Sequence, residues 1–272
     1  MGTYLINAIT IQRAEIGESD VLVTAYSRER GKVRFVVRGT KKPASSLRGA
    51  VEPLTEGRFF LVERTGTDLL SEWEPAEYNF EMKKDIGKLA LAQYLGRMII
   101  EFSGEGIKDN KLYIFLKNII FILYSKYPDD IIKLVIEWGF LTVSGLAPDF
   151  GVCVVCGRFD NAQGYLWEIN EGDFYCDGCA AGTGAHYVKL GRDEVALGRK
   201  IEAAARLLID NQYESAGDAA RGMSHFAFGE SGAIRGSATL SRGLSGFCRY
   251  HLREDVPEWR VKLNAGTRAA GR

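Results

Sequence analysis

Two Cys-x-x-Cys pairs restrict what this chain can fold into more than any other feature of its sequence. Nineteen residues separate the pairs, which comprise Cys153, Cys156, Cys176 and Cys179. This spacing is typical of a four-cysteine zinc site, in which each pair forms a tight turn that points both thiolates inward. The segments Gly164 to Glu168 and Asp173 to Cys176 are predicted to form a hairpin that brings the pairs together.

Four sulfur ligands complete the coordination shell of a zinc ion, so the site is predicted to be structural rather than catalytic. The alternative is a pair of disulfides or idle thiols, which the expected reducing compartment disfavours. The fifth cysteine, Cys248, stands apart and is predicted to be a small buried hydrophobe.

The first 73 residues alternate between short apolar-polar segments and turns. The segments are LINAITIQRAEI, VLVTAYS, KVRFVVRG, FFLVER and DLLSEWE. Five strands of this length, with one longer connection from Thr40 to Pro53, predict a small antiparallel barrel of the OB-fold type. A β-sandwich usually needs more strands.

The segment from Arg28 to Arg48 holds eight lysines and arginines and one acid, a charge of +7 in a chain whose formal net charge is zero. Such a local concentration of cations suits a nucleic-acid backbone, although charge runs are often only solvated surface. Phe35 shares its parity with Val33 and Val37, so one face of this strand is predicted to be core and the other cationic. The predicted DNA contacts are Lys32, Arg34 and Arg38 on the strand, Lys41, Lys42 and Arg48 on the loop, and Tyr26 as a surface on which a base stacks.

The pattern changes to a helical period after a predicted cap at Asn79. Further helices are predicted from about Asn110 to Tyr124, Pro128 to Leu141, Arg192 to Ile209 and Leu244 to Leu252. The stretch from Asn211 to Arg242 has weak periodicity and fits a loop, a poorly ordered segment or a marginal helix.

Several functional classes find no support in the sequence. There is no phosphate-binding loop, dinucleotide glycine fingerprint, metalloprotease motif or serine-hydrolase motif. The acids Glu15, Glu18 and Asp20 are predicted to be a solvated turn feature rather than an acid site. No signal peptide or membrane span is apparent, so the expected location is the cytoplasm, without a membrane partner.

Several specific motifs occur together in this chain: Gly17-Glu18-Ser19-Asp20, Arg30-Gly31-Lys32, Arg38-Gly39-x-Lys41-Lys42, Ser46-x-x-Arg48-Gly49-x-x-x-Pro53-Leu54, the cysteine quartet and Tyr250-His251-Leu252. With these motifs, the sequence from about Leu5 to Leu252 resembles the RecO family of bacterial recombination mediators. The segment from Asn211 to Arg242 departs from the helical pattern expected in that family.

The resemblance implies a non-enzymatic DNA-repair protein that binds single- and double-stranded DNA and anneals complementary strands. It also implies action with RecR to load RecA onto strands coated with single-strand-binding protein, a contact with the C-terminal tail of that protein, and association with the nucleoid. Exposed cations near the apolar helices are candidates for the tail contact: Lys117, Lys126 and Lys133.

The resulting expectation is an α+β multidomain protein. An OB-fold DNA-binding domain is predicted over residues 1–78 and a helical bundle over 79–150. A four-cysteine zinc insertion over 151–182 precedes a C-terminal helical part over 183–272. One competing interpretation is a zinc-ribbon protein-interaction module without DNA binding. A metal-dependent nuclease would require an open metal site, which the cysteine pattern does not offer.

Overall fold

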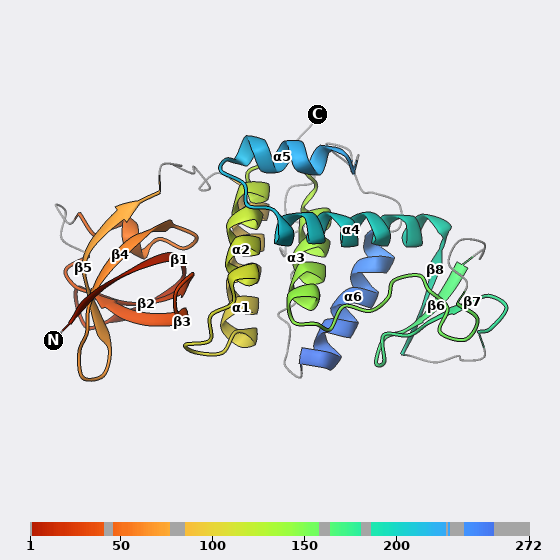
Figure 1. Cartoon of the computed structure of the whole chain (residues 1–272), viewed down its shortest axis with the longest axis horizontal. Coiled ribbons are helices and arrows are strands. Elements are labelled where there is room, and N and C mark those ends of the chain that lie inside the picture. Colours follow the sequence, from red (N-terminus) through yellow and green to blue (C-terminus); the bar gives the residue numbers. More distant parts are fainter. Residues whose placement is uncertain are drawn as a thin grey trace, which may run out of the picture.

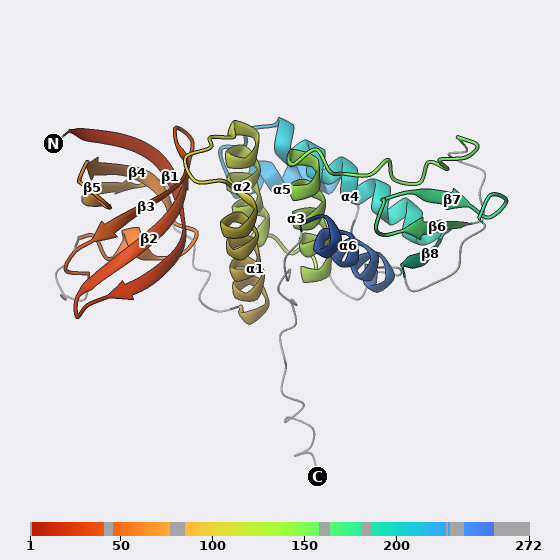
Figure 2. The same ribbon diagram turned by 90° about the horizontal axis from the view of Figure 1, so that it is seen from below.

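The protein consists of a barrel, a group of helices and a small sheet, which lie side by side along its longest axis (Figures 1 and 2). The computed structural model describes residues 2–40, 46–76, 85–157, 164–180, 186–226, 228 and 237–252. The predicted helix cap at Asn79 lies outside these residues. Among the described helices, none combines the length and the apolar character that crossing a bilayer requires.

Five strands form the closed barrel, in the order β1-β2-β3-β5-β4. They are β1 (Thr3–Ile16), β2 (Asp20–Ser27), β3 (Gly31–Val37), β4 (Glu56–Val62) and β5 (Asp68–Pro75). The β3–β5 pair is parallel and the other pairs are antiparallel. A short 3-10 helix, η1 (Gly49–Val51), lies in the connection from β3 to β4. The predicted five-stranded barrel is therefore confirmed, with a strand order that matches an OB fold.

Every second side chain along the barrel strands points inward and fills the barrel interior. Phe35 and Phe59 are fully buried there, with their ring centroids 5.5 Å apart. Val23, Val37 and Leu61 belong to the same apolar cluster. Phe35 is therefore part of the core, as its parity predicted.

In the described part of the chain, six helices follow the barrel: α1 (Ile86–Phe102), α2 (Asn110–Leu123), α3 (Asp129–Val143), α4 (Arg192–Asp210), α5 (Ala216–Ser224) and α6 (Ser237–Leu252). Asp85 caps α1 by accepting hydrogen bonds from the N–H groups of Gly87 and Lys88. The bounds of α2, α3 and α4 agree with the predicted ones within two residues, because these helices carry wide apolar faces. The stretch with weak periodicity contains α5, and α6 begins seven residues before its predicted start.

The cysteine segment forms a three-stranded sheet of order β7-β6-β8. Strands β6 (Gly164–Glu168) and β7 (Phe174–Cys176) are the predicted hairpin, and β8 (Tyr187–Gly191) adds a strand that was not predicted. Trp167 stacks on Phe174 with ring centroids 5.2 Å apart, and both belong to the same apolar cluster as the helices. Burial of these aromatic rings joins the sheet to the helical core.

Candidate nucleic-acid interface and metal centre

Strands β1, β2 and β3 expose an outer face whose side chains lie in rows across the sheet. Thr24 pairs with Gln12 on one side and with Arg34 on the other, so these three side chains form one row. The neighbouring row is apolar and consists of Ala14, Leu22 and Val36. Asp20 begins the last row, beside Arg38, which directly follows β3. The face thus presents an apolar strip between two arginines.

Both arginines are exposed and each faces a carboxylate. The side chain of Arg34 is 52% exposed and lies 2.7 Å from Glu105, which belongs to the loop between α1 and α2. The side chain of Arg38 is 60% exposed and lies 3.8 Å from Asp20. Asp20 also accepts a hydrogen bond from the N–H of Gly39. Exposed ion pairs of this kind are weak, so a phosphate can compete for either guanidinium.

The next row toward the helices consists of Ile9, Tyr26 and Lys32, and it is covered. Tyr26 is 1% exposed and its hydroxyl accepts a hydrogen bond of 3.2 Å from the N–H of Asp109. Burial raises the pKa of Tyr26 to about 12, although this hydrogen bond acts in the opposite direction. Lys32 is 8% exposed and its Nζ donates a hydrogen bond of 2.6 Å to the carbonyl of Ile100 in α1.

This burial contradicts two of the predicted DNA contacts. Tyr26 cannot stack on a base and Lys32 cannot reach a phosphate while α1 and the following loop cover their row. Parity correctly placed Lys32 outside the barrel, and Tyr26 is its partner across the strands, but the helical part of the protein packs on that portion of the outer face. The side chains of the three exposed rows include no aromatic ring, so this face favours contacts to the nucleic-acid backbone over stacking on bases.

The loop after β3 carries the remaining predicted contacts. Arg48 is exposed and immediately precedes η1. Lys41 and Lys42 lie outside the described residues, and their role stays a prediction. Sequence reasoning missed Gln12 and Thr24, because only the pairing register reveals that they share a row with Arg34.

The four predicted metal ligands converge at the far end of the molecule. The sulfur atoms of Cys153, Cys156, Cys176 and Cys179 all lie within 4.8 Å of one another. The sulfurs of Cys156 and Cys176 are 3.7 Å apart, and none of the cysteines forms a disulfide. Four sulfurs placed tetrahedrally at about 2.3 Å from a metal ion are separated by about 3.8 Å, so the cluster fits a closed tetrahedral site.

The electrostatics of the cluster also suit a metal ion. Burial raises the pKa of Cys153, but N–H groups of Cys176, Cys156 and Val155 outweigh it and lower that pKa to about 6. Hydrogen bonds shared with the thiols of Cys176 and Cys156 raise the pKa of Cys179 to about 12. Four thiols this close cannot all ionise unless a cation offsets their repulsion. The cluster is therefore one that could hold a metal ion.

Cys248 is fully buried in the helical core, and burial raises its pKa well above the ordinary value for a thiol. This confirms its predicted role as a small hydrophobe. Two of the three cations suggested for a tail contact are not exposed. Lys133 is 5% exposed and pairs with Glu137 at 2.6 Å, and Lys117 lies 3.4 Å from Glu56 with its side chain 17% exposed. Lys126 is exposed.

Together these features define an OB-fold protein with a helical domain and a cluster of four cysteines that could bind a metal ion. Two family profiles match the chain: Recombination protein O N terminal over residues 1–79 and Recombination protein O C terminal over residues 83–202. The DNA repair protein RecO of Desulforamulus reducens is 31% identical over 66% of this chain and 70% of its own length. The RecO proteins of Syntrophomonas wolfei and Bacillus mycoides are each 29% identical. They are matched over 75% and 63% of this chain and over 83% and 68% of their own lengths, respectively.

The chain therefore belongs to the RecO family, whose role lies in DNA repair and recombination.

Proposed function

We propose that this protein binds single- and double-stranded DNA through the outer face of β1, β2 and β3. The observation that carries the proposal is the exposed pair of Arg34 on β3 and Arg38 directly after it, on the face that binds oligonucleotides in OB folds. Arg48, which is exposed just before η1, adds a further cation to the proposed surface. Lys41 and Lys42, which lie outside the described residues, are proposed DNA contacts from their sequence alone.

The same face suits the annealing of complementary strands. Annealing requires that two polyanions approach each other while their bases stay free to pair. Arginines that contact phosphates reduce the repulsion between strands, and a face without aromatic side chains leaves the bases unstacked from the protein. The protein thus supports pairing through electrostatics and without a catalytic group.

The mediator role follows from the proposed DNA binding and from the family. In this role the protein acts with RecR to load RecA onto strands coated with single-strand-binding protein, and it contacts the C-terminal tail of that protein. Its place of action is the nucleoid in the cytoplasm. The metal ion is one structural Zn²⁺, because four thiolates form the ligand set that zinc prefers and leave no open position for a substrate.

The test is the affinity for a single-stranded oligonucleotide as a function of salt concentration. The variant Arg34→Ala/Arg38→Ala removes two exposed cations from the face. We expect weaker binding and a salt dependence shallower by about two phosphate contacts. The control Arg192→Ala/Lys200→Ala removes two exposed cations from α4, far from the barrel (Figure 1). Equal affinity of both double variants would contradict the proposed site.

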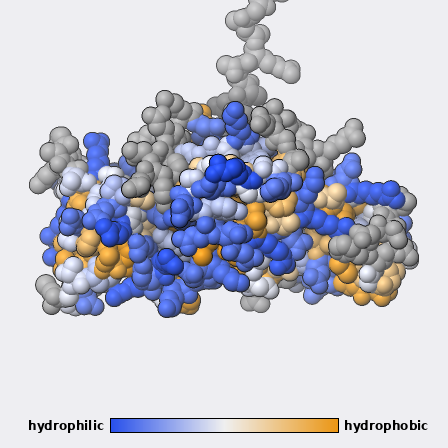
Figure 3. Space-filling view, turned by 45° about the horizontal axis from the view of Figure 1, so that its top comes forward, coloured by the Kyte–Doolittle hydropathy of each residue, from blue (hydrophilic) through white to orange (hydrophobic). Residues whose placement is uncertain are grey.

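A second candidate function is a protein-interaction module built on the metal centre. Val154 and Val155 lie between two metal ligands, and they are 54% and 65% exposed. The space-filling view shows apolar side chains at the barrel end and at the end with the small sheet, on an otherwise mostly hydrophilic face (Figure 3). An intact, zinc-loaded protein without salt-dependent DNA affinity would favour this function.

A further inference from the structure

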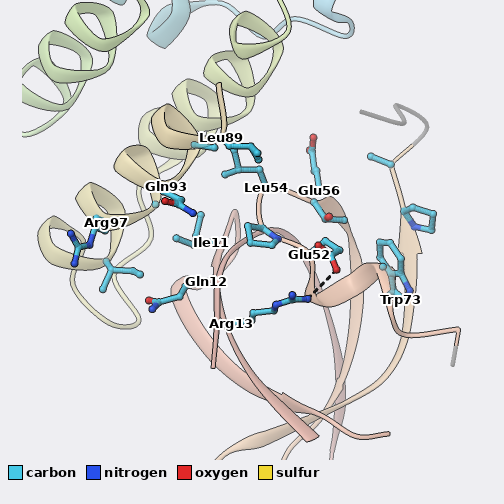
Figure 4. Close-up of a pocket in the computed structure, with 18 of the residues that line it drawn as sticks. Ile11, Gln12, Arg13, Glu52, Leu54, Glu56, Trp73, Leu89, Gln93 and Arg97 are labelled. Atoms are coloured by element: carbon cyan, nitrogen blue, oxygen red, sulfur yellow. Dashed lines mark hydrogen bonds and ion pairs between the residues drawn. The ribbon is translucent and has the colours of Figure 1, made fainter. Parts of the chain in front are cut away.

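A cavity of about 630 Å³ lies where the barrel meets α1 (Figure 4). Its helical wall carries Leu89, Gln93 and Arg97, whose spacing of four residues places them on one face of α1. Its barrel wall carries Gln12 and Arg13 near the end of β1. The cavity therefore lies beside the row of Gln12, Thr24 and Arg34.

The floor of the cavity is apolar and fixed. Ile11 is 5% exposed and Leu54 is 3% exposed. The backbone of Thr10 exchanges hydrogen bonds of 2.9 and 2.6 Å with the carbonyl of Thr55 and the N–H of Leu54. Its hydroxyl donates a further hydrogen bond of 3.0 Å to the carbonyl of Ala50. These contacts hold the strand and the loop together, so the cavity is preformed.

Two backbone irregularities meet at this floor. The pairing of β1 with β2 shifts register between Thr10 and Gln12, which directs Ile11 and Gln12 toward the cavity wall. Leu54 has a φ of 59°, the only positive φ outside glycine in the part of the chain that the structure describes. Bulges and strained residues concentrate where a backbone must shape a binding site.

The charges around the cavity favour an anionic ligand. Glu52 pairs with Arg13 at 3.0 Å, and Glu56 accepts a hydrogen bond of 3.0 Å from Tyr113 and lies 3.4 Å from Lys117. Both carboxylates are thus offset by cations. Arg97 is exposed and pairs with no carboxylate among the described residues. Arg97 is therefore the lining cation that has no carboxylate partner within the described ranges.

We propose that this cavity receives one nucleotide of a single DNA strand that is bound across β1, β2 and β3. The amides of Gln12 and Gln93 contact the edge of the unpaired base, and Arg97 contacts its phosphate. The inference rests on the proposed function, because Gln12 joins the cavity to the row that contains Arg34. A base in a duplex is already paired and stacked, so the cavity serves single strands only.

The test compares two cavity variants with two controls that make the same chemical change elsewhere. Gln93→Glu places a carboxylate in the cavity, and Gln212→Glu makes that change at an exposed position after α4. Arg97→Ala removes the rim cation, and Lys200→Ala removes an exposed cation from α4. The probes are fluorescein-labelled oligothymidylate and a duplex of equal length, measured by anisotropy at one salt concentration. The unfolding midpoint of each variant verifies that its fold is intact.

We expect each cavity variant to bind oligothymidylate about fivefold or more weakly than its control, and to bind the duplex as its control does. If the wild type binds DNA and the cavity variants match their controls, this inference fails while the proposed function stands. If the cavity binds a peptide instead of a nucleotide, the cavity variants will also bind both DNA probes as their controls do, and the inference fails. If affinity for both probes falls equally, the residues act only through general electrostatics and the inference fails. If the wild type binds neither probe, both the inference and the proposed function fail.

Discussion

In the proposed DNA complex, a phosphate at Arg34 would have to replace the ion pair that Arg34 forms with Glu105 of the helical domain. Glu105 lies 2.7 Å from Arg34, in the position that a phosphate oxygen would take. The same loop is held against β3 by a hydrogen bond of 3.1 Å from the N–H of Gly106 to the carbonyl of Lys32. Replacing Glu105 with glutamine keeps the size of the side chain and removes its charge. We therefore expect Glu105→Gln to bind DNA more tightly than the wild type.

The exposure of the pair sets the size of this effect. The side chains of Arg34 and Glu105 are 52% and 61% exposed, and exposed ion pairs contribute about 0.2–1 kcal/mol. Since DNA must break the pair to reach Arg34, its loss should tighten binding by about 1.4-fold to fivefold. A larger gain would mean that Glu105 also repels phosphates bound to other residues.

The assay is equilibrium binding of a labelled oligonucleotide at low salt. Any change of glutamate to glutamine raises the net charge by one, so the control must make the same change at a similar ion pair. Glu202 pairs with Arg206 at 3.1 Å on α4, which makes Glu202→Gln a suitable control. If Glu105→Gln and Glu202→Gln bind equally, Arg34 is not a DNA contact or Glu105 does not compete for it.

Three further changes test a buried ion pair, a close backbone contact and the proposed metal site. Lys133→Met leaves the fully buried Glu137 without its cation, and we expect a loss of about 3–5 kcal/mol in the free energy of unfolding, measured with urea. Gly31→Ala adds a methyl group 2.0 Å from the carbonyl oxygen of Ile107, at a position where φ is 65°. Backbone strain alone should lower the free energy of unfolding by about 1–2 kcal/mol, and the clash should lower it, and with it the unfolding midpoint, further. Cys156→Ser, or treatment with a strong chelator, should release the metal and lower the thermal midpoint, as metal analysis and calorimetry would report.

Each of these changes has a matched control. Lys133→Met/Glu137→Met removes both buried charges and should recover part of the lost stability. If it recovers none, the loss caused by Lys133→Met comes from altered packing and not from an unpaired charge. Gly17 has a φ of 67° and open space around it, so Gly17→Ala isolates the backbone strain. If Gly17→Ala lowers the free energy of unfolding as much as Gly31→Ala does, the methyl group's contact with Ile107 adds no destabilisation. Cys248→Ala should retain one metal ion per chain, and loss of the metal would contradict the proposed ligand set.

Local patterns were sufficient to predict most elements of the fold, but not β8 or the first part of α6. Alternation around Phe35 identified a strand with one buried face, because side chains of a strand point to opposite faces in turn. The apolar faces of α2, α3 and α4 were wide enough to set their bounds. The first part of α6, near Ser237, was not predicted because its small and polar residues give only a weak helical pattern. Packing against the rest of the protein stabilises the helix there.

The sequence by itself determined the barrel strands, the four cysteines that cluster and the strand face on which Arg34 lies, because each depends on short-range spacing along the chain. Tertiary structure alone decided which part of the cationic face stays open. Tyr26 and Lys32 point outward from the barrel, yet α1 and the loop after it cover them, while Arg34 lies one row farther and stays exposed. The cavity that Gln12 and Arg97 line likewise forms between segments about 85 residues apart in the sequence. Their contact cannot be predicted from the local spacing of apolar and polar residues.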